Sequence, residues 1–385
     1  MFWIPLLILG IFIIALEIIF THNWLRAILI IVITAFLSAA TIGIDYTIQT
    51  TDTEVWSGSV IEWSHDEEWD EWHPPVTTCT TDSNGKQNCT TTPGYWEHHY
   101  AENHIKTSDK GWIYVDKSPD GKRFDDNWPN DSSVLKKYWP EGTPTASRHT
   151  YTNKVNASYS IYKHKDVDLE KFPDLPNYPD KVRDKMFIDR IIGSVPNKEK
   201  ASVLLSHHNT RLNKQVPDPE RENKTRSWKQ VNMIFVNVGE NKSEDYGFAL
   251  QDSWEGGNKN DFVVSFSMNS DGTLNWVYPF SWSEVEILKL EVRDYMMDLK
   301  KINDFVPVVE KVSTMVEEKF ERKEFADFDY LQIDPSNGVI VLIWVFSILA
   351  IIVNAFLIFK EKQDQSNRRN TDRLYNPHRY YNPRK

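Results

Sequence analysis

The chain has 385 residues, of which 26% are charged and 40% hydrophobic, and its net charge is -11. The negative charge argues against nucleic acid as the main partner, and 19 prolines with 15 glycines are too few for a collagen-like or disordered chain. Two cysteines are too few for a disulfide scaffold. The apolar residues are unevenly spread, because three blocks near the ends are almost wholly apolar and the region between them is acidic and rich in aromatic residues.

The three apolar blocks, at residues 2–20, 27–44 and 338–359, predict membrane-spanning helices. A bilayer core about 30 Å thick needs roughly 20 apolar residues at about 1.5 Å each, and every block is close to that length. A cleaved signal peptide is the alternative for the first block, but it lacks a basic start and a small-residue cleavage site, and a second apolar run follows at once. We expect a helical hairpin over residues 1–45 and a final span over 338–359.

Lysine and arginine near the spans predict the orientation, because they collect on the cytoplasmic side of a membrane. Residues 360–385 have eight basic and three acidic side chains, a net charge of +5, which leaves -16 on residues 45–359. We therefore expect a cytoplasmic tail at 360–385 and, with three spans in the cell membrane, an outer region over residues 46–335. Glu17 lies about one turn from the cytoplasmic end of its span, within reach of Arg26.

Cys79 and Cys89 flank a segment that contains Asn84-Gly85, a strong signal for a hairpin turn, and threonines surround both cysteines. A disulfide across a hairpin is the expected structure in an oxidising compartment. Free thiols are the alternative, and a zinc site would need further thiols nearby.

Residues 46–168 form a tryptophan-rich region in which helical periodicity is poor, so we expect a mainly antiparallel β module carrying the disulfide hairpin. Four of its tryptophans are interleaved with carboxylates: Trp63, Trp69, Trp72 and Trp96. Aromatic side chains of this kind serve the core of a small β module or anchor a protein partner, which is the interpretation we favour. Stacking on sugar rings is the alternative, as in carbohydrate-binding surfaces.

Five histidines lie between residues 65 and 104, in a stretch that also contains eight acidic residues. If the hairpin brings its arms together, His65 or His73 could approach His98 and His104, and imidazole with carboxylate suits zinc or another borderline divalent metal. The region contains no HExxH sequence and no CxxC pair. A strand with one hydrated polar face explains the same alternation, and the sequence implies no cofactor beyond this candidate metal.

A proline-rich segment at residues 169–180 is expected to be an extended linker, and residues 181–335 alternate strand and helix patterns. This alternation predicts an α/β layered domain. Its expected helices and strands are residues 182–192 (helix), 198–212 (helix), 231–238 (strand), a helix that starts at Ser243, 262–268 (strand), 274–280 (strand), a helix with a capping box at Ser283 and Glu286, and 305–324 (helix).

Residues 246–254 (YGFALQDSW), followed by Gly257-Asn-Lys-Asn-Asp261 and a buried strand, resemble the TPM domains of bacterial and plastid membranes. The resemblance covers roughly residues 180–303. It implies a membrane-anchored extracytoplasmic α/β module and, as an activity, a metal-dependent hydrolase or phosphatase with a metal at Asp261 or in the histidine cluster. The family's Asp-Asn-Gly triplet is replaced here by Asn260-Asp261-Phe262.

Taken together, these patterns predict an α+β multi-pass membrane protein with three transmembrane helices, an extracytoplasmic β-rich module and an α/β layered domain. The expected function is a non-enzymatic envelope protein that displays a binding domain, and the alternative is the TPM-type hydrolase. The expected partners are the lipid bilayer and a protein partner or a second copy of the chain.

Overall fold

The computed structural model describes residues 3–81, 85–124, 128–158, 167–179, 188–219 and 221–375, with the backbone alone at 156 and 370–375. The chain folds as two compact units. The first consists of Met1–Thr51, Thr152–Tyr159 and Phe328–Lys385, and the second of Asp52–Tyr151 and Ser160–Asp327.

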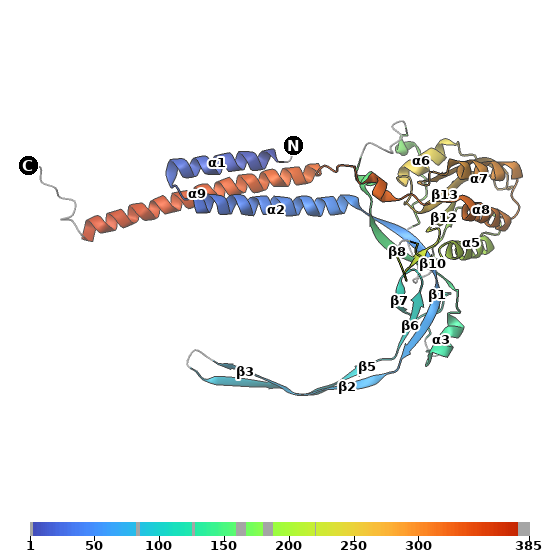
Figure 1. The fold of residues 1–385 in the computed structure, drawn as a ribbon, viewed down its shortest axis with the longest axis horizontal. Helices are drawn as coiled ribbons and strands as arrows, with labels where there is room; N and C mark the ends of the chain where they lie inside the picture. The colour runs from blue at the N-terminus through green and yellow to red at the C-terminus, as the bar shows by residue number, and fades with distance from the viewer. Residues whose placement is uncertain are drawn as a thin grey trace, which may run out of the picture. The chain divides into compact units, whose positions relative to one another are not determined.

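The first unit is built from three helices that pack side by side (Figure 1). They are α1 (Ile4–Phe20), α2 (Trp24–Thr50) and α9 (Asn337–Tyr375), and the short helix α4 (Lys154–Ala157) contacts α2. Leu9, Ile13, Ala27 and Ala350 form the shared core. In length and composition, α2 and residues Asn337–Arg369 of α9 are suited to cross a membrane, while α1 is an apolar helix of 17 residues.

Polar contacts hold both ends of this helical unit. At one end the buried Glu17 accepts a hydrogen bond from Arg26 Nε at 2.8 Å, as its position in the sequence predicted, and Arg26 also pairs with Glu361 at 2.9 Å. At the other end Asp45 on α2 accepts hydrogen bonds from the backbone N–H and the hydroxyl of Ser336, both at 2.8 Å, one residue before α9 begins.

A four-stranded antiparallel sheet forms the first part of the second unit, in the order β7-β6-β1-β8. Its strands are β1 (Thr51–Asp66), β6 (Glu102–Thr107), β7 (Gly111–Tyr114) and β8 (Pro144–Thr152). Its core contains Val60 and Ile105 from the sheet together with Leu135 and Trp139, which helix α3 (Ser132–Tyr138) and its end contribute.

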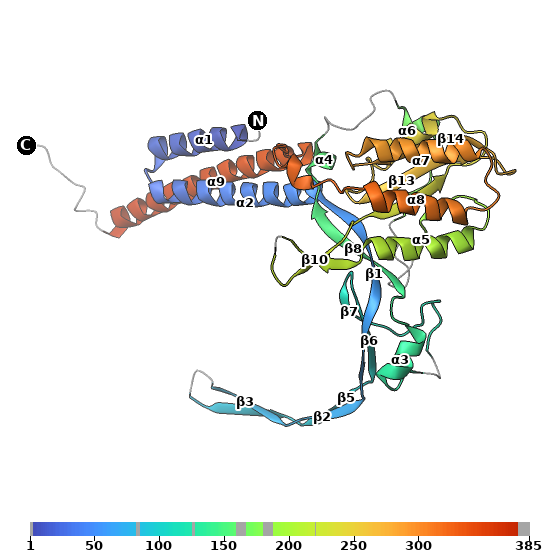
Figure 2. The same cartoon turned by 45° about the vertical axis from the view of Figure 1, so that its right-hand side comes forward.

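The hairpin continues beyond this sheet as a two-stranded ribbon (Figures 1 and 2). We use the word ribbon for β2 (Trp69–His73) paired with β5 (Tyr95–His99), and β3 (Val76–Thr81) paired with β4 (Gln87–Thr92). Asp66 faces Glu102, Trp69 faces His99 and Val76 faces Thr92, so a residue number and its partner's add up to 168 in all three ladders. The hairpin therefore keeps one register from Glu62 outward, and an irregularity between Val60 and Glu62 shifts the pairing by one residue nearer its base. Of the expected turn, Asn84 lies outside the described residues.

The α/β layered domain that the sequence predicted forms the rest of the second unit. Its sheet has the order β14-β13-β12-β9, in which β9 (Ile191–Ile192), β12 (Asn232–Asn237) and β13 (Asp261–Met268) are parallel and β14 (Leu274–Ser281) is antiparallel. All residues of β12 and β13 are buried, because helices cover both faces of the sheet. One face packs against α5 (Lys198–Leu212), α7 (Glu286–Leu299) and α8 (Val306–Lys319), and the other against α6 (Asp245–Ser253). Three small elements complete the unit: the hairpin β10 (Gln215–Pro217) with β11 (Thr225–Ser227), and the 3-10 turns Leu169–Lys171 and Phe325–Phe328.

Buried polar contacts tie the start of β1 to the α/β domain. The side chain of Arg190 donates a hydrogen bond to Ser57 at 2.7 Å, and Asn260 donates one to the carbonyl of Val55 at 2.7 Å. Glu54 pairs with Arg322 at 3.0 Å. The β module and the α/β domain thus belong to one unit.

Several local predictions differ from the structure; the helix expected over residues 305–324, for example, ends at Lys319. Ile191–Ile192 form a strand beside β12 instead of the end of a helix, and residues 182–187 lie outside the described part of the chain. Helix α7 begins at Glu286, and the hydroxyl of Ser283 accepts a hydrogen bond from Val285 N–H, so the two residues do not form a capping box. In the proline-rich segment, Leu175 and Tyr178 pack against the α6 face of the sheet. The segment is therefore part of the folded domain instead of a separate extended linker.

Candidate functional site

The ribbon exposes its aromatic side chains. Trp69, Trp72 and Trp96 are 55%, 47% and 67% exposed, and Tyr95 is similarly exposed. A two-stranded ribbon has no second layer to cover either face, and side chains alternate between its two faces. Large aromatic side chains on such a surface contact solvent unless another molecule covers them.

One face of the β2–β5 pair carries even-numbered residues. Trp72 lies directly opposite Trp96, with ring centroids 5.1 Å apart, and His98 Nδ1 lies 2.7 Å from a carboxylate oxygen of Asp70. Gly94 makes room for Trp72, since a Cβ atom at that position would meet the indole ring at 2.6 Å. The glycine therefore allows the indole pair to pack against the backbone of the ribbon.

The other face of this pair carries odd-numbered residues in a near-symmetrical arrangement. Glu71 and Glu97 lie directly opposite each other. On one side of them His99 stacks on Trp69 with centroids 4.3 Å apart, and on the other side His73 stacks on Tyr95 at 4.7 Å. His73 Nε2 lies 2.8 Å from Glu97, and His99 Nε2 lies 3.2 Å from Glu71.

Trp63 differs from the other three candidate tryptophans. It lies on β1 within the four-stranded sheet, and its indole N–H donates a hydrogen bond to the carbonyl of Trp139 at 2.7 Å. Lys136 covers its ring at 4.4 Å. Trp63 therefore supports the module's core, whereas Trp69, Trp72 and Trp96 belong to the exposed ribbon.

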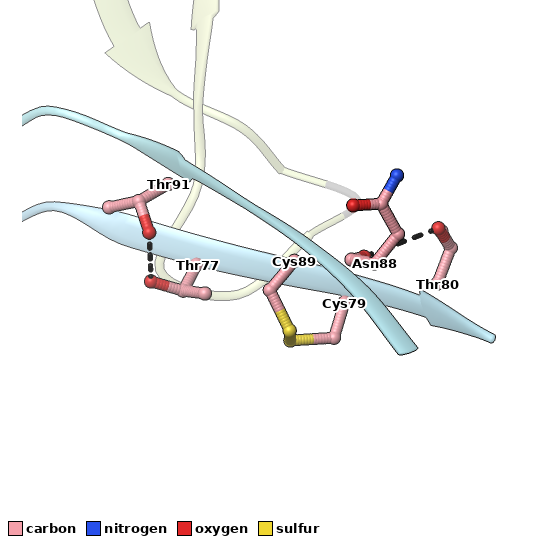
Figure 3. The surroundings of a disulfide bond; sticks show 6 residues. All are labelled: Thr77, Cys79, Thr80, Asn88, Cys89 and Thr91. Atoms are coloured by element: carbon pink, nitrogen blue, oxygen red, sulfur yellow. Dashed lines mark hydrogen bonds between the residues drawn. A yellow bond between two sulfur atoms is a disulfide. The ribbon is translucent and has the colours of Figure 1, made fainter. Parts of the chain in front are cut away.

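The disulfide between Cys79 and Cys89 is present and joins β3 to β4 near the tip of the ribbon (Figure 3). The hydroxyls of Thr77 and Thr91 lie 2.9 Å apart beside it. Every side chain of β3 and β4 is exposed, so the pair has no apolar core of its own. The disulfide therefore supplies stability to this pair of strands, since a structure this small cannot gain it by burying apolar side chains.

The four candidate metal ligands of the sequence do not come together. His98 and His104 lie on one arm of an extended hairpin, six residues apart, which corresponds to about 20 Å of strand. His65 faces Asn103, while His104 faces Ser64, so these two imidazoles point to opposite faces of the sheet. Asp261 lies in the α/β domain at the start of β13.

Two other groups of histidine and carboxylate are compact, within the part of the chain that the structure describes. One consists of Asp66, Glu102 and His104, and the other of Glu71, His73 and Glu97; in each, one ligand atom per residue lies within 4.8 Å of the others. His73 was expected to approach His98 and His104, and its grouping with Glu71 and Glu97 was not predicted. Placing Cys79 directly opposite Cys89 fixes the sum of 168 and would have paired Glu71 with Glu97 and His73 with Tyr95.

Asp261 is fully buried and bonded within the protein. Its carboxylate accepts hydrogen bonds from Asn232 at 2.8 Å, Tyr178 at 2.8 Å and the backbone N–H of Asn258 at 2.7 Å. Burial raises the pKa of Asp261 to about 7, although these hydrogen bonds act in the opposite direction. The carboxyl group of Asp261 can therefore bind a proton in the interior of the domain, and no part of it is exposed to solvent.

Comparisons with models of known protein families, with curated protein sequences and with solved structures find no match to this chain.

Proposed function

We propose that this chain is a three-span membrane protein with a cytoplasmic tail at residues 360–385. In this arrangement it holds residues 46–335 on the outer side of the cell membrane, where the ribbon binds a protein partner without catalysing a reaction. The observation that carries the proposal is the exposed aromatic surface of the ribbon, at Trp69, Trp72, Tyr95 and Trp96.

The exposed apolar surface of the helical unit supports the membrane setting. Large apolar side chains point outward from all three helices, for example Ile19, Phe36 and Phe356, which are 66%, 72% and 62% exposed. A core helix of a water-soluble protein would bury such side chains, whereas lipid tails are a suitable solvent for them. Helix α1 packs on both α2 and α9, as a retained span would, and at about 1.5 Å per residue its 17 residues cover about 26 Å.

Charge supports the orientation, since the tail carries +5 and residues 45–359 carry -16. A cysteine introduced by Lys385→Cys tests it in intact cells with a thiol reagent that cannot cross lipid. We expect labelling only after the membrane is opened, while Thr90→Cys on the ribbon is labelled in intact cells. Labelling of position 385 in intact cells would reverse the proposed topology.

The ribbon suits a protein partner because tryptophan and tyrosine are the side chains that most often anchor protein interfaces. They bury a large area while losing little conformational freedom. With a metal at Asp261, the enzymatic alternative would need a carboxylate that can reach a substrate, whereas Asp261 is fully buried and accepts three hydrogen bonds from the protein. We therefore favour binding over hydrolysis.

A photo-crosslinking amino acid at Tyr95, beside the tryptophans, tests partner binding in native membranes. We expect a discrete cross-linked protein, and we expect the triple variant Trp69→Ala, Trp72→Ala, Trp96→Ala to lose it. The matched control is Trp112→Ala, which removes a tryptophan that is 49% exposed on β7, outside the ribbon. Equal loss in the control, or an unchanged cross-link in the triple variant, would contradict the proposal; a cross-link to a second copy of the chain would identify the partner as the protein itself.

A further inference from the structure

The odd-numbered face of the β2–β5 pair presents an electrostatic problem. Glu71 and Glu97 lie directly opposite each other on a ribbon that has no other layer, and like charges in this position destabilise an antiparallel pair. A two-stranded ribbon is only marginally stable to begin with. A cation between the two carboxylates would convert this repulsion into a cross-strand link.

The neighbouring side chains specify which cation would fit. Two imidazoles flank the carboxylates, and in both it is Nε2 that faces them, from His73 on β2 and from His99 on β5. A set of two imidazole nitrogens and two carboxylates suits zinc or a similar borderline divalent ion, whereas magnesium and calcium prefer oxygen alone. Glu71, His73 and Glu97 form the compact part of this set, and His99 lies outside it, with its Nε2 3.2 Å from Glu71. The imidazoles distinguish the set from an ordinary patch of surface acids.

The rings are also held in place before any ion binds. His99 lies parallel to Trp69 within 8° and His73 lies parallel to Tyr95 within 18°, which restricts rotation of both imidazoles. Metal sites depend on such supporting contacts, because they orient the ligands. His73 directs one atom, Nε2, toward both Glu71 and Glu97, at 3.8 and 2.8 Å. In the other compact group His104 directs Nδ1 toward Asp66 and Nε2 toward Glu102, each at 3.5 Å, so its two nitrogens contact different carboxylates.

We propose that Glu71, His73, Glu97 and His99 bind one zinc-type divalent cation that links β2 to β5. The ion would hold the middle of the ribbon, as the disulfide between Cys79 and Cys89 holds its tip. This inference is independent of the proposed partner, because the site is complete within one chain.

The experiment uses the full-length protein in detergent, stripped with a chelator and then titrated with zinc by calorimetry, with elemental analysis after dialysis. We expect about one zinc ion per chain, and X-ray absorption with nitrogen and oxygen ligands at about 2.0–2.2 Å. The double variant His73→Gln, His99→Gln should weaken binding by about tenfold or more, since even supporting contacts contribute that much. Hydrogen exchange in residues 69–73 and 95–99 should slow on zinc addition in the wild type and not in this double variant.

The matched control is Asp70→Asn with His98→Gln, which removes a carboxylate and an imidazole from the even-numbered face of the same strands. Zinc affinity should stay within about twofold of the wild type in this control. Because all these side chains are partly or fully exposed, every variant should keep the thermal unfolding temperature of the α/β domain unchanged. Absence of stoichiometric zinc, binding that survives the loss of His73 and His99, or binding abolished by His104→Gln instead would overturn the proposal.

Discussion

The hydroxyl of Tyr178, in the proline-rich segment, donates a hydrogen bond of 2.8 Å to the carboxylate of Asp261, at the start of β13. The same hydroxyl accepts a hydrogen bond from the side chain of Asn258 at 2.8 Å. The contact joins residues 83 positions apart and explains why the segment packs on the domain. It also places a titratable group in the interior, with consequences for pH dependence.

We expect the stability of the α/β domain to fall as pH rises from about 4 to about 7. Burial raises the pKa of Asp261 to about 7, so the folded protein holds a proton that the unfolded chain releases near pH 4. Stability from this group is therefore full below pH 4 and lost as pH rises through 7, by up to roughly 4 kcal/mol. Urea unfolding between pH 4.5 and 8, followed by tryptophan fluorescence, measures it. Asp261→Asn should flatten the slope, while the exposed control Asp298→Asn should keep it; equal slopes in all three proteins would refute the assignment.

The ion pair between Glu54 and Arg322 gives a second prediction, because Glu54 is only 2% exposed. Arg322→Met leaves this carboxylate with Lys259 at 3.4 Å as its remaining ion-pair partner, and we expect a loss of about 3 kcal/mol in the free energy of unfolding. Adding Glu54→Gln should recover part of that loss, which a double-mutant cycle measures. Lys323→Met, which removes ion pairs with the exposed Glu284 and Asp327, should cost less than about 1 kcal/mol. If Arg322→Met and Lys323→Met reduced the free energy of unfolding by similar amounts, the result would argue against a special contribution of the buried Glu54–Arg322 pair.

Loss of the disulfide should affect the ribbon and leave the rest of the protein unchanged. The double variant Cys79→Ser, Cys89→Ser removes the covalent link of β3 and β4, whose side chains are all exposed. We expect hydrogen exchange in residues 76–81 and 87–92 to approach that of an unstructured peptide, because no apolar core remains to hold the pair. Mass spectrometry of these peptides measures the effect. The urea midpoint of the α/β domain is the internal control, and undiminished protection of the tip would show that the disulfide is dispensable.

Arg26 is expected to be required for the helical unit because it neutralises the buried Glu17. In a membrane, Arg26→Leu would leave a carboxylate without its counter-charge, and we expect the yield of folded protein to fall several-fold. Gel filtration in detergent measures the folded fraction, and Glu17→Gln in the same protein should restore most of it. Glu361→Gln removes the second, more exposed partner of Arg26 and should have little effect. Failure of Glu17→Gln to rescue would show that Arg26 acts through another contact.

Much of the secondary structure could be predicted because its signal is local. The apolar spacing of residues 198–212 predicted helix α5 with the observed ends, and the run at 231–238 predicted β12 within one residue at each end. The strand at Ile191–Ile192 was not predicted, because two apolar residues form a strand only when a neighbour such as β12 pairs with them. That neighbour lies about 40 residues away along the chain.

The candidate site was harder to predict because it depends on register. The abundance of tryptophan in this region followed from composition, but the exposure of the ribbon's tryptophans did not. Neither did their separation from Trp63, since the partners of Trp63 are Trp139 and Lys136. The histidines were grouped by proximity in sequence. In an antiparallel hairpin, contact depends on distance from the turn instead, which joins Glu71 to Glu97 and separates His98 from His104.

The constant sum of 168 limits how this hairpin could change length in evolution or by engineering. One residue added to a single arm would offset every pair beyond it, turn those side chains over and separate Cys79 from Cys89. A balanced addition of one residue per arm would keep the partners but exchange the two faces. The smallest extension that preserves both is two residues in each arm, so the reach of the hairpin should vary in steps of about 7 Å.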